Sequence, residues 1–359
     1  MKNERNSSFE ILRILAMLLI IGHHFVWYSG ILNLDAIGCR NTLPAQVLYL
    51  GGPLGVNVFF MLSGYFYGNK FKTAKLVKLD LTVLFYSVCG FLLSAFWLHR
   101  PYQGKDIVKA ALPLSTSVYW FLTVYVIVYM TSPVLNAVIE KLNKKQFIII
   151  GTFVLFFVSI FPTVAFPMKL THFNTMMMRG FLCYFLGAYL KKFPIRFLDH
   201  PISSLACFLG SYVFMGIVSI LGKIHSSIET WNFAKTVLCD VHTSVPMLFC
   251  AMSAVMLAKS LPIGSVRYIN LLSSTTLGVY VIHDNPYIRS YIWNDLLKTN
   301  ALSNSDHYVL YALRGILMVF LACAAVEMLR ELVIESFLDR WFDRVKLFQK
   351  ADAIINISD

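Results

Sequence analysis

Two histidines stand in strongly apolar parts of the chain, where an ionisable side chain is costly to keep. His24 lies near the end of an apolar run that begins at residue 11, and Glu10 and Arg13 precede it. A helix turns by about 100° per residue, so the eleven steps from Arg13 to His24 return to the same face within about 20°. Glu10, three residues before Arg13, shares that face. The spacing predicts one polar stripe on an otherwise apolar helix, with Arg13 and His24 separated by a rise of about 16 Å.

A second apolar run repeats this pattern and ends at His283. Ser273, Thr276, Tyr280 and His283 follow one another at intervals of three, four and three, which places them on one helix face. Imidazole is the side chain that most readily takes and returns a proton near neutral pH. His24 and His283 are therefore candidates for catalysis. Simpler interpretations stay open: an interfacial Glu10–Arg13 pair, a His24 that only joins helices, and a His283 that marks the membrane boundary.

The composition indicates which class of protein carries these histidines. Of 359 residues, 57% are hydrophobic and 14% are charged, whereas a soluble domain carries roughly 25% charged residues. So much apolar surface excludes a disordered chain. Seven cysteines without CxxC or Cys/His spacing predict neither a disulfide framework nor a metal site. The net charge of +12 is spread over many short loops, which argues against nucleic acid as a partner.

Apolar runs near 20 residues predict an all-α polytopic membrane protein with about ten transmembrane helices. Lys and Arg number 20 in the segments on the side of the N-terminus and 9 in the opposite loops, so both termini are expected in the cytoplasm. The first run is read as a retained helix rather than a cleaved signal peptide. The expected spans are about 11–29, 47–68, 79–98, 118–138, 147–167, 173–190, 202–222, 236–258, 267–284 and 308–329.

The C-terminal part has a different pattern. Between residues 327 and 348, apolar residues recur every three or four positions and alternate with charged ones. This predicts an amphipathic helix on the inner leaflet, or else a solvated extension of the tenth span. We therefore divide the chain into a single integral membrane domain, 1–330, and a cytoplasmic amphipathic tail, 331–359. Glu327 is expected at the interface.

Four further polar groups fall in or near apolar runs, mostly toward the outer half of the expected bilayer: Arg179, Asp240, His242 and Arg314. They indicate a shared outer-half cavity, or pairing between helices, for example Asp240 with Arg314.

The second expected span contains small residues and is followed by lysines. Gly51 and Gly55 form a small-xxx-small pair that favours close helix approach. The four lysines between Lys70 and Lys78 indicate either cytoplasmic topology or a basic rim that attracts a phosphorylated donor.

Taken in order, these segments resemble acyltransferase family 3, whose membrane proteins move acyl groups onto carbohydrates and other cell-surface acceptors. Glu10, Arg13 and His24 match the family's opening helix. The family's glycine-valine and phenylalanine-phenylalanine run is present, with Asn57 where family members often carry Asp. Later motifs are Trp120-Phe121-Leu122 and the stretch from Leu277 to His283. The residues that match the second motif are Gly55, Val56, Phe59, Phe60, Ser63, Gly64 and Tyr65.

The resemblance implies a membrane O-acyltransferase that moves an acetyl or other short acyl group to a hydroxyl of a cell-surface carbohydrate. Acetyl-CoA is the implied co-substrate, with no bound cofactor. His24 is expected to act as the base or a transient acyl carrier, and His283 to orient a substrate or share the proton. Arg13 would hold a donor phosphate or pair with Glu10. Ser63, Tyr65 and Trp120 complete the expected substrate and donor site. The resemblance implies that the acyl donor comes from the cytoplasm and that the acceptor is reached from the outer side of the cell membrane or on a lipid carrier. Membrane lipid is a further expected partner.

An alternative function is a polysaccharide exporter or transporter without acyl-transfer chemistry, because transporters also place polar residues near the middle of the membrane. Internal inverted repeats would favour that function, and none is evident in the sequence.

Overall fold

The apolar runs of the chain form long helices, and no strand occurs among the residues that the structure describes. The structure is a computed structural model that describes residues 6–34, 41–68, 70–161, 172–335, 342 and 345–356. The main helices are α1 (Ser7–Ser29), α2 (Thr42–Tyr65), α3 (Thr73–Leu92), α4 (Gly104–Ala111), α5 (Trp120–Lys141), α6 (Lys144–Leu155), α8 (His172–Lys192), α9 (Pro201–Ile224), α10 (Glu229–Lys235), α11 (Val245–Ser260), α12 (Arg267–Ser274), α13 (Thr276–His283), α14 (Tyr308–Arg330) and α16 (Lys346–Ile355).

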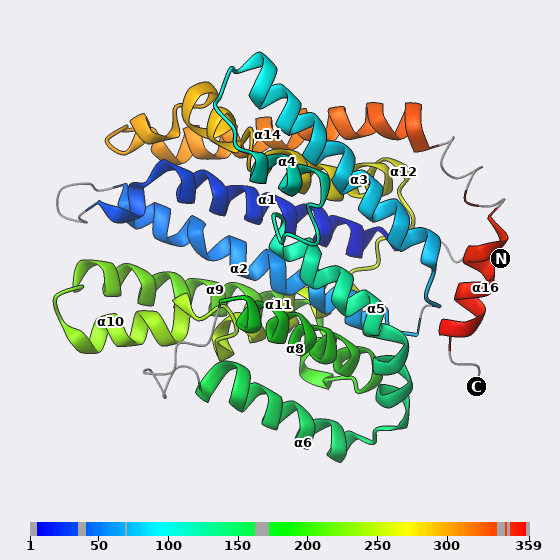
Figure 1. Cartoon of the computed structure of the whole chain (residues 1–359). Coiled ribbons are helices and arrows are strands. Elements are labelled where there is room, and N and C mark those ends of the chain that lie inside the picture. The colour runs from blue at the N-terminus through cyan, green and yellow to red at the C-terminus, as the bar shows by residue number, and fades with distance from the viewer. Residues whose placement is uncertain are drawn as a thin grey trace.

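Seven helices in the described ranges are long and apolar enough to cross a membrane. Each of them coincides with one of the ten expected spans. They run side by side along the long direction of the bundle (Figure 1). The seven are Ser7–Ser29, Thr42–Tyr65, Thr73–Trp97, Trp120–Lys141, Pro201–Ile224, Glu229–Ser260 and Tyr308–Ile334.

The other three expected spans have different outcomes. The run 147–167 corresponds to α6 and the π turn Phe156–Ile160, and its last residues lie outside the described part of the chain. The run 173–190 forms helix α8. The run 267–284 forms two short helices, α12 and α13, which meet at Thr275, so its role as a span is not confirmed. The ten-span topology and the cytoplasmic termini therefore stay predictions.

Hydroxyl groups explain the break between α12 and α13. Ser274, Thr275 and Thr276 each donate their hydroxyl to the carbonyl three residues earlier, at 2.7–2.8 Å. Such local bonds compete with the regular helical ladder and bend helices. The break leaves α13 as a short separate segment that carries His283.

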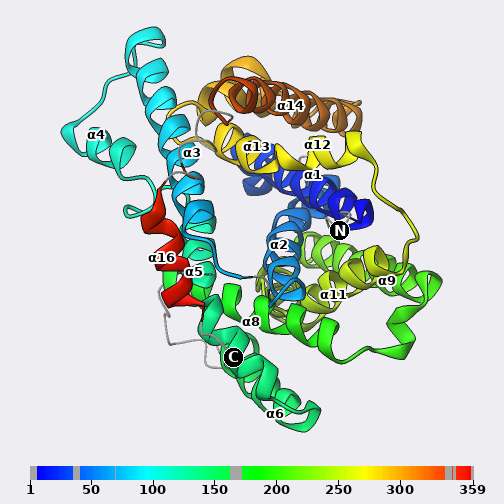
Figure 2. The same ribbon diagram turned by 90° about the vertical axis from the view of Figure 1, so that its right-hand side faces the viewer.

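Helices α1 and α2 lie in the middle of the bundle (Figure 2), between α12–α14 on one side and α8, α9 and α11 on the other. Glycines, which have no Cβ atom, allow neighbouring helix backbones to approach closely. A Cβ atom on Gly55 would collide with the carbonyl oxygen of Ala16 on α1. On the other face of α2, a Cβ on Gly64 or on Gly187 of α8 would collide with the carbonyl of Tyr184 or Met61. Small residues at such crossings let membrane helices pack by direct backbone contact.

The outer faces of the bundle are apolar. On α9 and α14, Val213, Ile217, Leu313 and Leu321 are each about half exposed or more. An exposed apolar surface of this extent fits a lipid environment rather than water.

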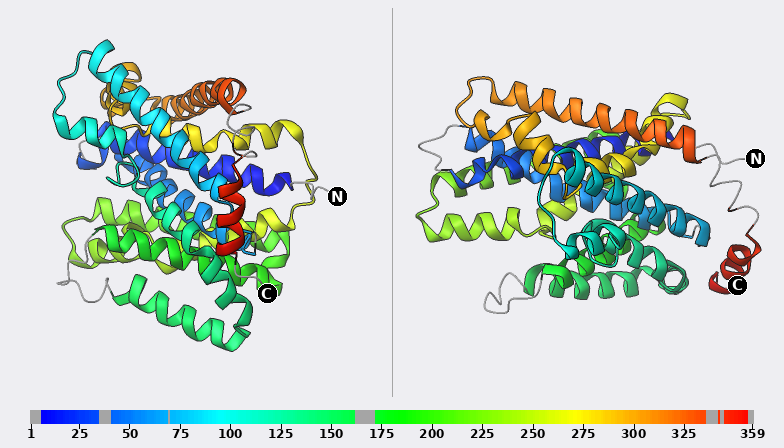
Figure 3. Two further views of the ribbon diagram at one scale, coloured as in Figure 1. Left: turned by 45° about the vertical axis from the view of Figure 1, so that its right-hand side comes forward. Right: turned by 45° about the horizontal axis from the view of Figure 1, so that its top comes forward.

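The last helix, α16, packs against the beginning of α3 and lies at the same end of the bundle as the start of α1 (Figure 3). The Asp352 carboxylate accepts hydrogen bonds from the backbone N–H and the hydroxyl of Thr73, both at 2.6 Å, and so satisfies a free amide in the first turn of α3. Phe337, Leu338 and Trp341 of the predicted amphipathic helix lie outside the described residues, so that helix remains a prediction.

Glu327 lies near the C-terminal end of α14, and its expected position at the membrane interface stays a prediction. Its side chain is buried, forms an ion pair with Arg330 at 2.7 Å, and accepts the Tyr86 hydroxyl at 2.6 Å. The absent side chain of Gly278 on α13 makes room for this carboxylate. Burial is tolerated because the charge is both paired and hydrogen-bonded.

Candidate functional site

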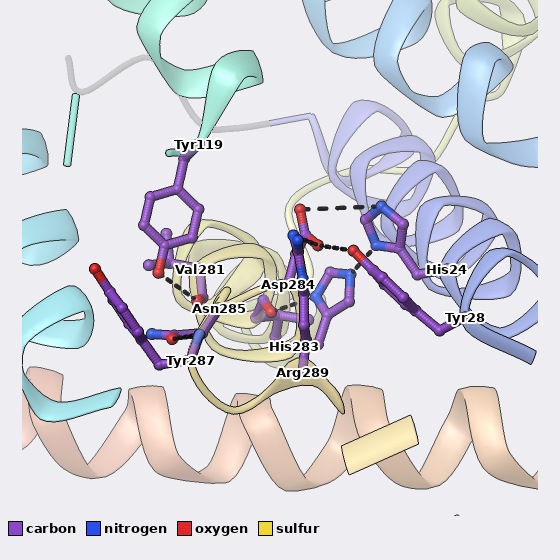
Figure 4. A network of polar contacts seen from close by, with 10 residues as sticks. His24, Tyr28, Tyr119, Val281, His283, Asp284, Asn285, Tyr287 and Arg289 are labelled. Atoms are coloured by element: carbon purple, nitrogen blue, oxygen red, sulfur yellow. Dashed lines mark hydrogen bonds and ion pairs between the residues drawn. The ribbon is translucent and has the colours of Figure 1, made fainter. Parts of the chain in front are cut away.

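The structure brings together the two histidines that the sequence singles out. Nδ1 of His24 on α1 lies 2.9 Å from Nε2 of His283 at the end of α13 (Figure 4). The His283 side chain is fully buried, and that of His24 is 15% exposed. We call this pair the histidine dyad. Its geometry permits one imidazole to share a proton with the other.

Backbone geometry determines which ring nitrogen of each histidine carries hydrogen. Nδ1 of His283 lies 2.6 Å from the carbonyl oxygen of Val279, which only accepts hydrogen bonds, so Nδ1 must donate. In neutral His283, Nε2 is then an acceptor, and Nδ1 of His24 must donate to it. Neutral His24 is thereby left with a free lone pair at Nε2. That nitrogen is the basic atom of the dyad.

A carboxylate stands near this basic nitrogen. Oδ2 of Asp284 lies 4.0 Å from Nε2 of His24, while its Oδ1 accepts the Tyr28 hydroxyl at 2.9 Å. Nη1 of Arg289 lies 3.4 Å from the same Oδ1, and its guanidinium stacks over the Tyr28 ring at 5.2 Å. If His24 takes up a proton, Asp284 is positioned to stabilise the resulting positive charge.

Tyr28, Asp284 and Arg289 were missed as site residues by sequence reasoning. Two signals were available: Tyr28 follows His24 by four positions and so shares its helix face, and Asp284 is adjacent to His283. Arg289 lies beyond Pro286, and only the folded chain places it on Tyr28.

Contacts with α3 and α5 hold α13 in place. The Tyr119 hydroxyl, at the beginning of α5, donates to the Val281 carbonyl at 3.3 Å. The Asn285 amide donates to the Tyr86 carbonyl of α3 at 2.9 Å. These bonds fix both sides of the segment that carries His283, and Figure 4 shows the one between Tyr119 and Val281.

A cavity of about 470 Å³ is lined in part by Arg289, the partner of Asp284. It is not the shared cavity suggested for Arg179, Asp240, His242 and Arg314, because none of these residues lines it; the two imidazoles do not line it either, whereas the segment that follows His283 does. The lining residues are Phe91, Ser94, Ala95, Arg100, Pro101, Tyr102, Asp106, Lys109, Thr116, Ser117, Val118, Pro286, Tyr287 and Arg289.

Tyr287 joins the cavity wall to α4. Its hydroxyl donates to the Asp106 carbonyl at 2.9 Å. Burial, together with the nearby Asp106 carboxylate, raises the pKa of Tyr287 to about 12. The phenol therefore stays protonated at neutral pH, as this hydrogen bond requires.

Glu10 and Arg13 lie at the opposite end of α1 from His24. Nη1 of Arg13 lies 2.5 Å from Oε1 of Glu10, and Ser273 of α12 donates its hydroxyl to Oε2 at 2.6 Å. The Arg13 guanidinium also lies over the Phe66 ring at 5.8 Å. The Arg13 side chain is 30% exposed, whereas Glu10 is buried. Glu10 and Arg13, which were predicted to share one helix face, thus form a direct ion pair.

The other three expected site residues contact neither histidine in this structure. Ser63 donates its hydroxyl to the Phe59 carbonyl of its own helix at 3.0 Å. Tyr65 packs on Phe9, with ring centroids 5.1 Å apart. Trp120, the first residue of α5, packs edge-on against its neighbour Phe121. These contacts are structural, and the substrate roles of Ser63, Tyr65 and Trp120 stay predictions.

The membrane arginine Arg179 is buried between α8 and α2. Its Nε donates to the Asn57 amide oxygen at 2.7 Å, its Nη2 donates to the Pro53 carbonyl at 2.7 Å, and Nη1 lies 3.1 Å from Nδ1 of His242. Asn57, which stands where members of the resembling family often carry Asp, is thus a direct partner of this cation. The network ties α2, α8 and the segment before α11 together.

The suggested pairing of Asp240 with Arg314 is wrong. Asp240 pairs with Lys235 at 3.0 Å, five residues earlier in the same helical segment. Arg314 lies on an exposed part of α14. A partner close in the chain costs less conformational entropy to bring near than one on a distant helix.

The apolar helices and the buried proton-sharing pair define a membrane protein with a site suited to acid–base chemistry. Residues 6–328 match the acyltransferase domain of acyltransferase family 3, and the chain belongs to this family of membrane acyltransferases. No curated protein and no solved structure shows significant similarity to the chain.

Proposed function

We propose that the protein is an integral O-acyltransferase of the cell membrane. It moves an acetyl or other short acyl group from acyl-CoA to a hydroxyl of a cell-surface carbohydrate. The observation that carries this proposal is the histidine dyad, in which backbone geometry leaves Nε2 of His24 as a free proton acceptor. Family membership supports the acyl transfer, and the apolar helices support the location.

The reaction requires a proton to move twice. Nε2 of His24 takes the proton of the acceptor hydroxyl while its oxygen forms a bond to the thioester carbonyl carbon. The carbon–sulfur bond then breaks, and the departing thiolate receives the same proton from His24. The products are an ester and free CoA thiol, so atoms and charge balance. Asp284 stabilises the transient imidazolium, and His283 shares its proton.

The two substrates approach from opposite ends of α1. Arg13 is partly exposed and sits about 16 Å along the helix from His24, given a rise of 1.5 Å per residue. Its guanidinium suits a donor phosphate, and the lysines between Lys70 and Lys78 add positive charge at the same end of the bundle. The dyad lies toward the other end, where we place the acceptor hydroxyl.

The decisive experiment is acyl transfer by purified protein in phosphatidylcholine nanodiscs, with radiolabelled acetyl-CoA and the surface glycan of the host. Replacing His24 by Ala removes the base, so we expect the rate to fall by about 10²- to 10⁴-fold. His200→Gln is the matched control, because His200 is exposed and makes no side-chain capping bond at the start of α9. Unchanged acetylation by His24→Ala at normal protein levels would remove His24 from the mechanism.

The same assay separates the enzyme from an exporter. An exporter would move unlabelled glycan across the bilayer and leave the acyl label on CoA. Transfer of label to glycan in nanodiscs, which have no closed interior, requires chemistry rather than transport.

A further inference from the structure

The cavity beside Arg289 has the composition of a binding site for a charged sugar. Three cations line it, Arg100, Lys109 and Arg289, against a single carboxylate, Asp106. Asp106 is already used, since its Oδ2 accepts the Gln103 backbone N–H at 2.9 Å as part of a helix cap. The volume of about 470 Å³ falls within the range of about 300–1,000 Å³ that is typical of small-molecule sites.

The charges in the cavity are not equally neutralised. Arg100 pairs with Asp295 at 2.8 Å, and Arg289 lies 3.4 Å from Asp284; neither of these carboxylates lines the cavity. Lys109 has no carboxylate partner within ion-pair distance among the residues that the structure describes. Exposed pairs such as Arg100–Asp295 contribute little stability, so they do not prevent Arg100 from contacting a ligand.

Aromatic rings provide the apolar part of the wall. Tyr102 and Tyr287 both pack edge-on against Phe91, with ring centroids 5.2 and 5.4 Å away. The small polar residues Ser94, Thr116 and Ser117 also line the cavity. Aromatic faces and dispersed hydrogen-bonding groups together suit a ligand that has both a C–H surface and many hydroxyls.

The position of the cavity favours the acceptor over the donor. The cavity lies at the C-terminal end of α3, near Leu92. The lysines between Lys70 and Lys78 lie at the other, N-terminal end of α3. The 20 residues of α3 span about 30 Å. One lining residue, Pro286, is only two positions after Asp284, the carboxylate next to the basic nitrogen of His24.

We propose that this cavity binds a carboxylated sugar unit, such as a uronic acid, of the acceptor glycan. Lys109, Arg100 and Arg289 contact its carboxylate, and Tyr102 and Tyr287 contact its ring. The inference rests on the proposed acyl transfer and adds the chemical class of the acceptor. Arg289 contributes twice, because it touches both the cavity and the Asp284 carboxylate of the catalytic network.

Binding without acyl donor tests the inference independently of catalysis. Full-length protein in phosphatidylcholine nanodiscs is titrated with glucuronate, galacturonate, glucose and galactose, and binding is followed by saturation-transfer NMR. We expect the uronates to bind at least tenfold more tightly than the neutral sugars. Lys109→Gln is expected to raise their dissociation constants about tenfold, since charge-assisted hydrogen bonds are the strong ones.

Lys105→Gln is the matched control. Lys105 lies one turn earlier on α4, is exposed, and does not line the cavity. Equal binding of neutral and acidic sugars, or equal effects of the two lysine substitutions, would overturn the inference. Displacement of the uronate by acetyl-CoA would also overturn it, by assigning the cavity to the donor. Uronate binding in a protein that transfers no acyl group would instead reject the proposed function and leave the site standing.

Discussion

His24 and His283 are 259 positions apart in the chain, yet Nδ1 of one lies 2.9 Å from Nε2 of the other. The bond connects α1 to α13 and continues from His283 to the Val279 carbonyl at 2.6 Å. A chain of hydrogen bonds that ends on a carbonyl has only one direction, because the carbonyl cannot donate. The dyad therefore presents its lone pair at Nε2 of His24 and nowhere else.

The direction of this chain predicts different outcomes for two substitutions of His283. His283→Ala removes the acceptor for Nδ1 of His24, so the ring loses its tautomer preference, and we expect kcat to fall about 100-fold. His283→Gln keeps an amide oxygen as acceptor and is expected to recover part of the loss. Steady-state kinetics over a pH range checks this, because a positioning role changes the pH profile as well as the rate. Equal losses for both variants, with an unchanged pH profile, would contradict it.

Asp284 is predicted to act on the charge of His24 rather than on its position. Two unit charges 4 Å apart interact by about 4 kcal/mol at an effective dielectric constant of 20, and Arg289 offsets part of this. Asp284→Asn is isosteric, and we expect it to lower kcat roughly 100-fold with little effect on KM. Tyr28→Phe removes only the hydrogen bond to Asp284 and is the matched control, with an expected loss below tenfold. A larger loss in Tyr28→Phe would show that the tyrosine, not the carboxylate, matters more.

Arg13 is predicted to contribute to donor binding. Arg13→Gln should raise KM for acetyl-CoA about tenfold and change kcat little, because Arg13 lies far along α1 from His24. The substitution also removes the Arg13 partner of the buried Glu10 carboxylate, which destabilises the protein.

The double variant Glu10→Gln, Arg13→Gln separates these two effects. It removes both charges, so its thermal unfolding midpoint should return toward that of the wild type while KM stays high. A donor KM that recovers together with stability would assign Arg13 a purely structural role.

The close crossing of α2 and α8 makes a prediction about stability. Gly187→Ala forces a methyl group into the Met61 backbone, and overpacking of this kind costs about 1–3 kcal/mol or more. We expect a lower thermal midpoint, or loss of the monodisperse peak in size-exclusion chromatography. Gly210→Ala is the control, since nothing lies within 4 Å of the added methyl on exposed α9. Its midpoint should be unchanged or higher, because Ala is the better helix former.

The sequence predicted the seven long spans because apolar runs near 20 residues have few alternatives to a membrane helix. It also predicted the histidines, since an imidazole in such a run is conspicuous. It did not predict the break at Thr275, where side-chain hydroxyls compete with the backbone within a run of ordinary composition. Contacts between distant segments, such as Arg289 on Tyr28 or Glu327 with Tyr86, depend on the packing of helices and leave no local signal.

The crossing at Gly64 and Gly187 also limits how the molecule can move. Sliding or rocking between two helices needs a layer of side chains that can change rotamer, and here main chain rests directly on main chain. The pair α2–α8 is therefore a rigid spine, and Arg179 fastens it further at Asn57. If the protein transfers acyl groups as proposed, we expect the motions that admit substrate and release product to occur in the peripheral segments around this spine.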